Sequence, residues 1–201
     1  MRAKRILDFV VSGTLLLLAT PVVLVVLAAF AVDVLLSRRD RGPLLYRERR
    51  ISKGREFDLL KFRTLRRDAL RRAQGHARPL EADPANLTWV GRRLLKPWYL
   101  DEIPQLLNVL FGQLSLVGPR PWPPELVERQ VAEGLTYRNE LPAGLTGLAQ
   151  VSKGSDRLYA DLDREYLERA RTLRGLGLAH YDLQILLRTI SVVLRGEGLS
   201  Y

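Results

Sequence analysis

An uncharged apolar run over residues 9–32 constrains the fold more than any other feature of the sequence. Leu, Val and Ala dominate this run. As a helix it is long enough to cross a hydrocarbon core of about 30 Å at about 1.5 Å per residue. A cleaved signal peptide is disfavoured, because the run is longer than an ordinary signal-peptide core and no small-residue cleavage site stands before the basic block. Hydropathy alone favours a simple spanning helix.

Two further features favour a re-entrant segment. Pro21 removes a backbone donor near the middle of the run, so a kink or break is expected there, and the Thr20 hydroxyl can bond a carbonyl that the break frees. Both flanks are basic, which places both ends on the cytoplasmic side. The flanking basic residues are Arg2, Lys4, Arg5, Arg38, Arg39 and Arg41. We therefore expect a helix-break-helix membrane anchor over residues 1–37 and a cytoplasmic globular domain over residues 38–201.

The charge and the cysteine content narrow the possible partners. Most of the formal charge of +10 lies in residues 37–72, directly after the apolar run. Attraction to anionic lipid, about 1 kcal/mol per basic residue, explains this block more simply than nucleic acid does. The chain has no cysteine, and two separated histidines, His76 and His180, cannot make a zinc site. Any metal should therefore be a hard ion with oxygen ligands.

The remaining pattern predicts one small α+β domain that is mainly helical. A short β-hairpin is expected close to the membrane, and the loop that follows it could act as a lid over a site. The last apolar helix could lie along the membrane interface or pack into the core. The expected elements are strands 44–49 and 56–62 with a turn at 52–54, helix 66–72, loop 74–86, helix 103–114, helix 125–133, a loop or strand region 142–154, and helices 162–174 and 185–194.

Asp101 and Glu102 are the first candidates for chemistry. They stand directly before the helix that Pro104 is expected to open. Taken alone, the pair is better explained as acidic residues that complement the helix dipole. Adjacent carboxylates point in different directions, however, so such a pair can also divide the work of a nucleophile and a metal ligand.

Cationic residues supply a second set of candidates. Pro119 and Pro121 fix the backbone on both sides of Arg120, whose guanidinium can match phosphate oxygens with paired hydrogen bonds. A surface turn with a solvated arginine explains this motif equally well. Lys61 and Arg63, at the end of the second expected strand, form a further cationic pair, for which a solvated charge near the membrane is the simpler explanation.

Six blocks in order resemble the bacterial sugar transferase family, in particular its small monotopic phosphoglycosyl transferases. The resemblance covers residues 4–190, and the order of the blocks makes it specific. The blocks are Lys4-Arg5-x-x-Asp8-Phe9, Lys61-Phe62-Arg63-Thr64, Leu100-Asp101-Glu102-Ile103-Pro104-Gln105-Leu106-Leu107-Asn108-Val109-Leu110, Ser115-Leu116-Val117-Gly118-Pro119-Arg120-Pro121, Gly144-Leu145-Thr146-Gly147-x-Ala149-Gln150-Val151 and Asp182-Leu183-x-Ile185-Leu186.

The resemblance implies an enzyme of the bacterial inner membrane, monotopic, with its catalytic domain on the cytoplasmic face. It would transfer a sugar 1-phosphate from a nucleoside diphosphate sugar, usually a UDP-sugar, to polyprenol (undecaprenyl) phosphate, and so initiate glycoconjugate assembly. Asp101 would be the nucleophile, and Glu102 would assist it in holding Mg²⁺ or in positioning. The residues implied to bind substrate are Lys61, Arg63, Lys96, Pro119, Arg120, Pro121, Arg138 and Gln150.

The sequence departs from the family pattern in three places. Lys96 stands where the family commonly has an arginine, next to an apparent one-residue insertion at Pro97-Trp98-Tyr99. The usual Pro-Gly of a later loop is Pro142-Ala143-Gly144. Residues 169–179 diverge most, so only Asp163 and Tyr166 are carried over near there as further candidates. The alternative is a non-catalytic membrane-bound assembly factor of the same fold.

Overall fold

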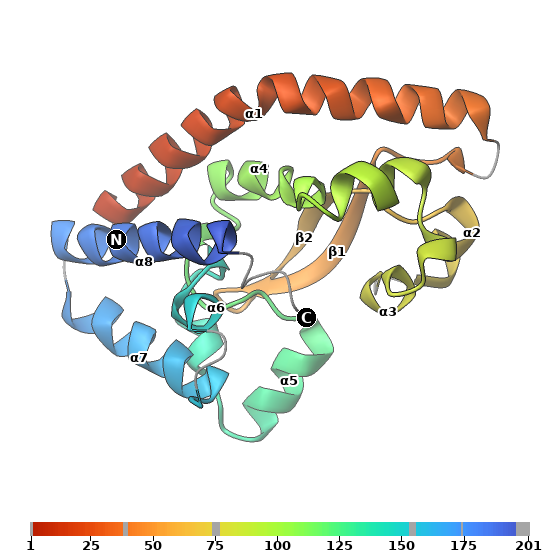
Figure 1. Ribbon diagram of the computed structural model, residues 1–201. Coiled ribbons are helices and arrows are strands. Elements are labelled where there is room, and N and C mark those ends of the chain that lie inside the picture. Colours follow the sequence, from red (N-terminus) through yellow and green to blue (C-terminus); the bar gives the residue numbers. More distant parts are fainter. Residues whose placement is uncertain (1, 38–39, 74–76, 153–155, 174, 196–201) are drawn as a thin grey trace. The chain divides into compact units, whose positions relative to one another are not determined.

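The computed structural model describes residues 2–37, 40–73, 77–152, 156–173 and 175–195. Three residues used in the predictions, Arg38, Arg39 and His76, lie outside the described residues, as does part of the predicted 142–154 region. Helices make up most of the described chain, which also holds two small two-stranded sheets (Figure 1). The predicted mainly helical α+β class is confirmed.

The chain divides into two compact units, each built from separated stretches. Unit 1 comprises Met1–Ser12, Arg50–Phe57 and Asn108–Tyr201, and unit 2 comprises Gly13–Arg49 and Asp58–Leu107. In chain order the elements are α1 (Arg2–Leu36), β1 (Leu45–Ser52), β2 (Arg55–Phe62), α2 (Arg67–Ala73), α3 (Arg78–Glu81), η2 (Pro84–Asn86), η3 (Gly91–Leu95), η4 (Leu100–Glu102), α4 (Gln105–Leu110), β3 (Ser115–Val117), α5 (Pro124–Ala132), η5 (Tyr137–Asn139), β4 (Gly144–Thr146), α6 (Leu148–Val151), α7 (Tyr159–Thr172) and α8 (Leu176–Leu194).

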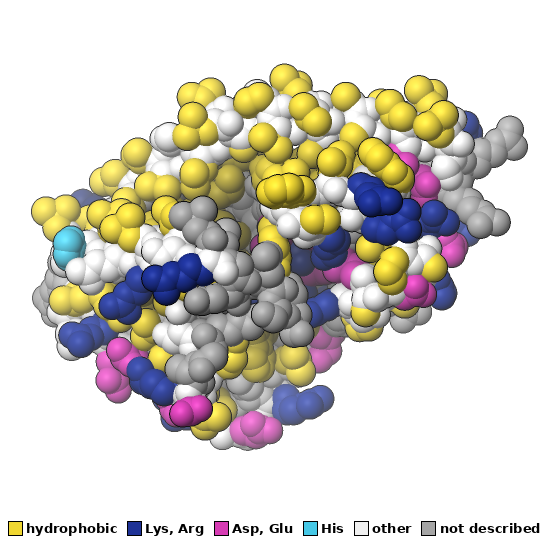
Figure 2. Space-filling model, in the orientation of Figure 1, with side chains coloured by type: hydrophobic (Ala, Val, Ile, Leu, Met, Phe, Trp, Pro, Cys, Tyr) yellow, Lys and Arg dark blue, Asp and Glu magenta, His cyan; other side chains and the backbone are white. Residues whose placement is uncertain are grey.

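The apolar run forms the middle of α1, which is one continuous α-helix with Pro21 inside it. The break predicted at this proline is not found. Thr20 Oγ1 donates to the Leu16 carbonyl oxygen at 3.1 Å, not to the Leu17 carbonyl that the missing Pro21 N–H leaves unpaired. By length and composition α1 could cross a membrane, and Figure 2 shows hydrophobic side chains along it. Such a surface indicates membrane association, while the re-entrant topology stays a prediction.

Part of the apolar run packs as protein core. In unit 2, Val26 and Phe30 of α1 are 1% and 5% exposed. They form one cluster with Phe62 of β2, Val90 and Leu95. The period of four residues between Val26 and Phe30 places both on one helix face, as burial against a single neighbouring layer requires. The second half of α1 therefore packs into the core of unit 2 with one face and leaves apolar side chains exposed on its other faces.

The predicted hairpin is confirmed, with both strands longer than expected. Lys53 and Gly54 connect β1 and β2 with φ angles of 50° and 70°. Positive φ at both central residues is the signature of a type I′ turn, whose twist suits a two-residue hairpin. Glycine tolerates this backbone conformation at no steric cost, which explains Gly54.

Two predicted helices begin or end elsewhere. Instead of a helix over 103–114, α4 covers only Gln105–Leu110, and Asp101 lies before it in the separate 3₁₀ turn η4. Phe111, expected on the apolar face, is 71% exposed. The final helix starts at Leu176, well before the predicted residue 185.

Unit 1 contains a parallel sheet that the sequence indicates only in part. β3 pairs with β4 in the register Ser115↔Gly144 and Val117↔Thr146. The region of β4 was predicted as loop or strand, while β3 fell inside a block interpreted only as a turn. α6 packs against α7 and α8, and α8 packs against both strands. This sheet carries the Pro119-Arg120-Pro121 segment out of the core.

Candidate functional site

The first candidate site, in unit 2, is built around the buried carboxyl group of Asp101. The residue is 2% exposed. Two irregular features lead to it: η3 is a π-helical turn, and Tyr99 has φ 54° and ψ 24°, a left-handed conformation that is costly for a bulky residue. Inserted residues are commonly accommodated as π-turns, and strained residues cluster at functional sites. The insertion suspected at residues 97–99 thus coincides with a locally irregular backbone.

The π-turn fits because of Gly91. A Cβ atom there would lie 2.4 Å from the Thr64 carbonyl oxygen, so this turn packs directly on the segment that follows β2. Lys96, which caps the π-turn, is thereby held near both the Thr64 segment and Asp101. Its Nζ lies 3.3 Å from Asp101 Oδ2 and 2.6 Å from Glu81 Oε2. Lys96, at the position where the family resemblance leads us to expect an arginine, therefore contacts the candidate nucleophile Asp101.

Burial and charge act on Asp101 in opposite directions. Burial raises the pKa of Asp101 to about 6, and Glu102 and Glu81 add to this, while the cations of Lys96 and Lys61 oppose it. Burial alone would lower the pKa of Lys96, but Asp101 and Glu81 outweigh burial and raise it. The site thus holds a protonated lysine beside a carboxylate that is ionised at neutral pH and poorly solvated, which is a suitable state for a nucleophile.

Lys61 and Arg63 have different roles although they are neighbours in sequence. Lys61 Nζ lies 3.4 Å from Glu48 Oε2 on the hairpin, and its charge acts on Asp101. Arg63 is 1% exposed, and all three guanidinium nitrogens donate to backbone carbonyl oxygens. The acceptors are Asp40, Pro43 and Leu65, at 2.6, 2.8 and 2.7 Å. Arg63, predicted to bind substrate, is therefore buried with each guanidinium nitrogen bonded to the backbone, and it acts as a structural cross-link.

The carboxylates suit magnesium by their donor chemistry. Among the described residues there is no group of three or more His, Cys, Asp or Glu side chains that could hold a metal ion. Magnesium, however, is commonly bound through one or two carboxylates, with substrate phosphates and waters completing its ligands. Asp101 and the half-buried Glu102 supply that number of hard oxygen donors.

The second candidate site lies in unit 1, where the Arg120 side chain is exposed between two prolines. Arg138, predicted to bind substrate, is instead buried beneath this segment and donates to the Arg120 carbonyl oxygen at 2.7 Å. Arg138 Nη2 lies 2.8 Å from Asp163 Oδ2, and burial raises the pKa of Asp163 to about 6 although Arg138 opposes it. Gln150 is half-buried, and its Oε1 atom is buried without a hydrogen-bond partner.

The first and last blocks of the family resemblance meet inside unit 1. Lys4 Nζ lies 2.7 Å from Asp182 Oδ2 and donates to the Val117 carbonyl oxygen at 2.8 Å. Tyr166 donates to Asp182 Oδ1 at 2.7 Å, and burial together with Asp182 raises the pKa of this tyrosine far above its ordinary value. On the next turn of α1, Asp8 accepts from the Leu116 N–H at 3.0 Å. These residues were evident as a motif but not as a buried network.

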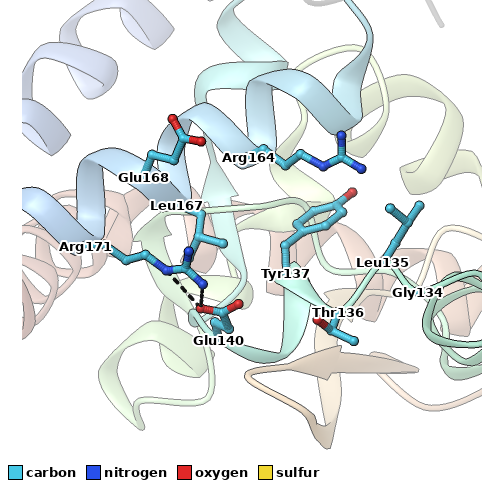
Figure 3. Close-up of a pocket in the computed structure, with 9 residues that line it drawn as sticks. All are labelled: Gly134, Leu135, Thr136, Tyr137, Glu140, Arg164, Leu167, Glu168 and Arg171. Carbon is cyan, nitrogen blue, oxygen red and sulfur yellow. Dashed lines mark hydrogen bonds and ion pairs between the residues drawn. The ribbon is translucent and has the colours of Figure 1, made fainter.

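An open cleft of about 250 Å³ lies between η5 and α7 (Figure 3). Arg171 of α7 pairs with Glu140 at one end of it, and both side chains are well exposed. None of the predicted site residues lines the cleft. The cleft is therefore not the predicted substrate site. It lies between the same two elements, η5 and α7, that the buried ion pair of Arg138 and Asp163 connects.

A long apolar helix, a buried carboxylate beside a lysine and a proline-fixed arginine together define a membrane-associated protein equipped to handle phosphate groups. Residues 1–196 match the family described as Bacterial sugar transferase. The chain belongs to that family.

Several relatives match over nearly all of the chain. It is 33% identical to the exopolysaccharide production protein ExoY of Rhizobium meliloti, covering 98% of this chain and 87% of that protein. It is 36% identical to a UDP-glucose:undecaprenyl-phosphate glucose-1-phosphate transferase of Caulobacter vibrioides, covering 97% and 71%. It is 35% identical to the undecaprenyl-phosphate galactose phosphotransferase of Salmonella typhimurium. That match covers 97% of this chain but only 41% of that protein.

Proposed function

We propose that this protein transfers a sugar 1-phosphate from a UDP-sugar to undecaprenyl phosphate in the bacterial inner membrane. The names of its relatives support a UDP-sugar donor and an undecaprenyl-phosphate acceptor. The observation that carries the proposal is Asp101, a buried carboxylate whose neighbour Lys96 keeps a positive charge beside it. The product, a polyprenol diphosphate sugar, would begin the assembly of a glycoconjugate such as an exopolysaccharide.

The reaction would proceed in two displacements at one phosphorus atom. An Asp101 carboxylate oxygen attacks the phosphorus that bears the sugar, and the bond to the bridging oxygen breaks, so UMP leaves with both electrons of that bond. A phosphate oxygen of undecaprenyl phosphate then attacks the same phosphorus and the bond to Asp101 breaks, which restores the carboxylate. Two steps let a soluble nucleotide and a lipid react in turn at one carboxylate.

The cationic and acidic residues of the two candidate sites would bind phosphate and neutralise its charge. Lys96 and Lys61 are placed to offset the negative charge of Asp101 and of an incoming diphosphate. Asp101 and Glu102 would hold Mg²⁺, which when bound neutralises charge on phosphate oxygens. Arg120, exposed on a fixed turn, would hold a phosphate group by paired hydrogen bonds.

The test of the chemistry measures UMP release from a panel of UDP-sugars with Mg²⁺ and undecaprenyl phosphate. The parent should turn over with at least one sugar, and Asp101→Asn should not. Asp68→Asn, an exposed carboxylate of α2, is the matched control and should keep the parent's rate. Intact-protein mass spectrometry of the parent, incubated with the UDP-sugar but without acceptor, should find the added mass of one phosphosugar, and Asp101→Asn should lack it. Turnover by Asp101→Asn would refute the covalent step, and a parent inactive on every sugar would favour the non-catalytic assembly factor.

The anchor over residues 1–37 is proposed as re-entrant: its exposed apolar part enters the membrane, and both of its ends and the remaining domain lie on the cytoplasmic face. The chain has no native cysteine, so single cysteines report topology without background. Arg2→Cys lies at the first residue of α1 and Arg41→Cys lies five residues after its last, Leu36. Both cysteines should react with a membrane-impermeant maleimide only after inner-membrane vesicles are inverted. Labelling from opposite sides would establish a spanning helix.

A further inference from the structure

The segment between β3 and α5 cannot hold itself in place by its own backbone. Positions 119, 121, 123 and 124 are prolines, which have no N–H to donate. Hydrogen bonds from outside the segment fix its carbonyl groups. Gly144 N donates to the Pro119 oxygen at 2.8 Å, and Ile51 N donates to the Trp122 oxygen at 2.9 Å. The carbonyl of Arg120, between these two points, is the one held by a side chain.

That side chain is Arg138, and its guanidinium is occupied on every edge. Nη1 donates to the Arg120 oxygen at 2.7 Å, Nη2 to Asp163 at 2.8 Å and Nε to Gln130 Oε1 at 2.9 Å. Its plane lies over the Trp122 ring, 4.2 Å from the ring centre. Lysine could not replace this arginine, because its compact ammonium group can neither spread three hydrogen bonds over three separated nitrogens nor stack a planar group on the indole ring.

Helix α7 supports the segment through Asp163, which orients Arg138 under the Arg120 carbonyl. One helical turn later, Tyr166 directs its single hydroxyl proton to Asp182 and lies beside the Val117 carbonyl oxygen, which accepts from Lys4 Nζ at 2.8 Å. The residue that precedes the segment is therefore fixed in the same buried network of unit 1. The backbone around Arg120 is thus fixed while its side chain stays exposed to solvent.

We propose that Arg138 and Asp163 are positioning residues, which fix the direction of the exposed Arg120 side chain from beneath and do not themselves contact substrate. The phosphate ligand of Arg120 rests on the proposed function, whereas the mechanical role does not. Arg138 was predicted from sequence to bind substrate, and its buried, fully occupied guanidinium gives it this different role.

The first test measures mobility and needs no activity. A nitroxide spin label on Arg120→Cys, the sole cysteine of the chain, reports motion of the segment by electron paramagnetic resonance. Asp163→Asn and Arg138→Lys should each narrow the spectrum. Arg171→Gln is the matched control. It breaks an exposed ion pair between α7 and Glu140, the residue directly after η5, and so acts between the same two elements. Unchanged spectra, or equal narrowing in all three variants, would overturn the proposal.

The second test separates positioning from general loosening by non-additivity. Misplacing a binding group by about 1 Å can cost on the order of 100-fold. Asp163→Asn and Arg138→Lys should therefore lower kcat/KM for the UDP-sugar roughly 10- to 100-fold in the parent. Once Arg120→Ala has removed the group to be positioned, the same changes should lower kcat/KM almost no further. Arg171→Gln should leave kcat/KM unchanged both in the parent and in Arg120→Ala. If Asp163→Asn and Arg138→Lys lowered kcat/KM equally in the parent and in Arg120→Ala, positioning would be refuted. Inactivity of the parent would refute the proposed function and leave the spectral test decisive.

Discussion

Replacing Asp101 with Asn should stabilise the protein while abolishing transfer. Asp101 is 2% exposed, and burial raises its pKa from 3.8 to about 6. At about 1.36 kcal/mol per pKa unit, holding this carboxylate ionised at neutral pH costs the folded state about 3 kcal/mol. Asparagine has nearly the same shape and no charge. Lys96, left without Asp101, still has Glu81 at 2.6 Å.

The pH dependence distinguishes this cause from a change in packing. Because the folded pKa lies above the unfolded one, the stability that Asp101 contributes is fully present below pH 3.8 and is lost as the pH rises through about 6. Between about pH 4.5 and pH 7.5 the loss amounts to about 2 kcal/mol. Asp101→Asn cannot titrate, so its advantage over the parent should grow by that amount over the same interval.

The assay is thermal unfolding in detergent micelles at several pH values. EDTA should be present, because a bound cation would lower the pKa of a carboxylate ligand. For a chain of this size 2 kcal/mol corresponds to a Tm difference of about 4–8 °C. The exposed Asp68→Asn serves as control and should follow the parent at every pH. Comparison with the parent also cancels the titration of Asp163, which has a similar pKa.

Two results would refute this reasoning. If the gain in the free energy of unfolding of Asp101→Asn over the parent were the same at every pH, the gain would come from packing and not from ionisation. If the variant were less stable than the parent at pH 7.5, the ion pair with Lys96 would outweigh the cost of burial. Either result would remove the argument that the folded protein keeps a poorly solvated carboxylate for chemistry.

Two further predictions concern the interior of unit 1. Lys4→Met should lower the free energy of unfolding by about 3–5 kcal/mol, because Asp182 is left buried without its cation, and adding Asp182→Leu should recover part of that loss in the same denaturation assay. Gly144→Ala should destabilise strongly, since its Cβ would lie 2.1 Å from the Gly118 nitrogen, whereas Gly177→Ala in α8 meets nothing closer than 3.6 Å and should stabilise by up to about 1 kcal/mol. Equal Tm values for the two alanine variants would contradict the close packing of β3 against β4.

The periodic elements could be predicted, and the surroundings of Asp101 could not. Two short strand-like stretches on either side of a turn at residues 52–54 predict the hairpin, and Gly54 lies where it reverses. Asp101 instead looked like an ordinary helix-start residue. Its burial depends on the π-turn η3 and on the left-handed Tyr99, and neither follows from local propensity. The motif resemblance identified the residue, but only the backbone irregularity explains its environment.

The surroundings of Arg63 could not be predicted from the sequence. Arg63 was expected to bind substrate, and it is buried with each guanidinium nitrogen donating to a backbone carbonyl oxygen. A carbonyl group is present at every residue, so its position near an arginine leaves no trace in the amino-acid pattern. Arg138 is also buried, and of its three acceptors only the Arg120 carbonyl is a backbone group.

The partners of the cations in the structure also change the interpretation of the basic block at residues 37–72. Arg63 is an interior cross-link, Lys61 pairs with Glu48, and Arg66 lies 3.5 Å from Asp40. These cations are engaged within the protein, so they add less to lipid attraction than a count along the sequence implies. The expected attraction to anionic lipid therefore rests on residues of the block whose side chains are exposed. Those exposed residues include Arg41, Arg55, Arg67 and Arg71. The buried Arg63 instead stabilises unit 2, so burial divides the basic block into structural cations and cations that a membrane surface can reach.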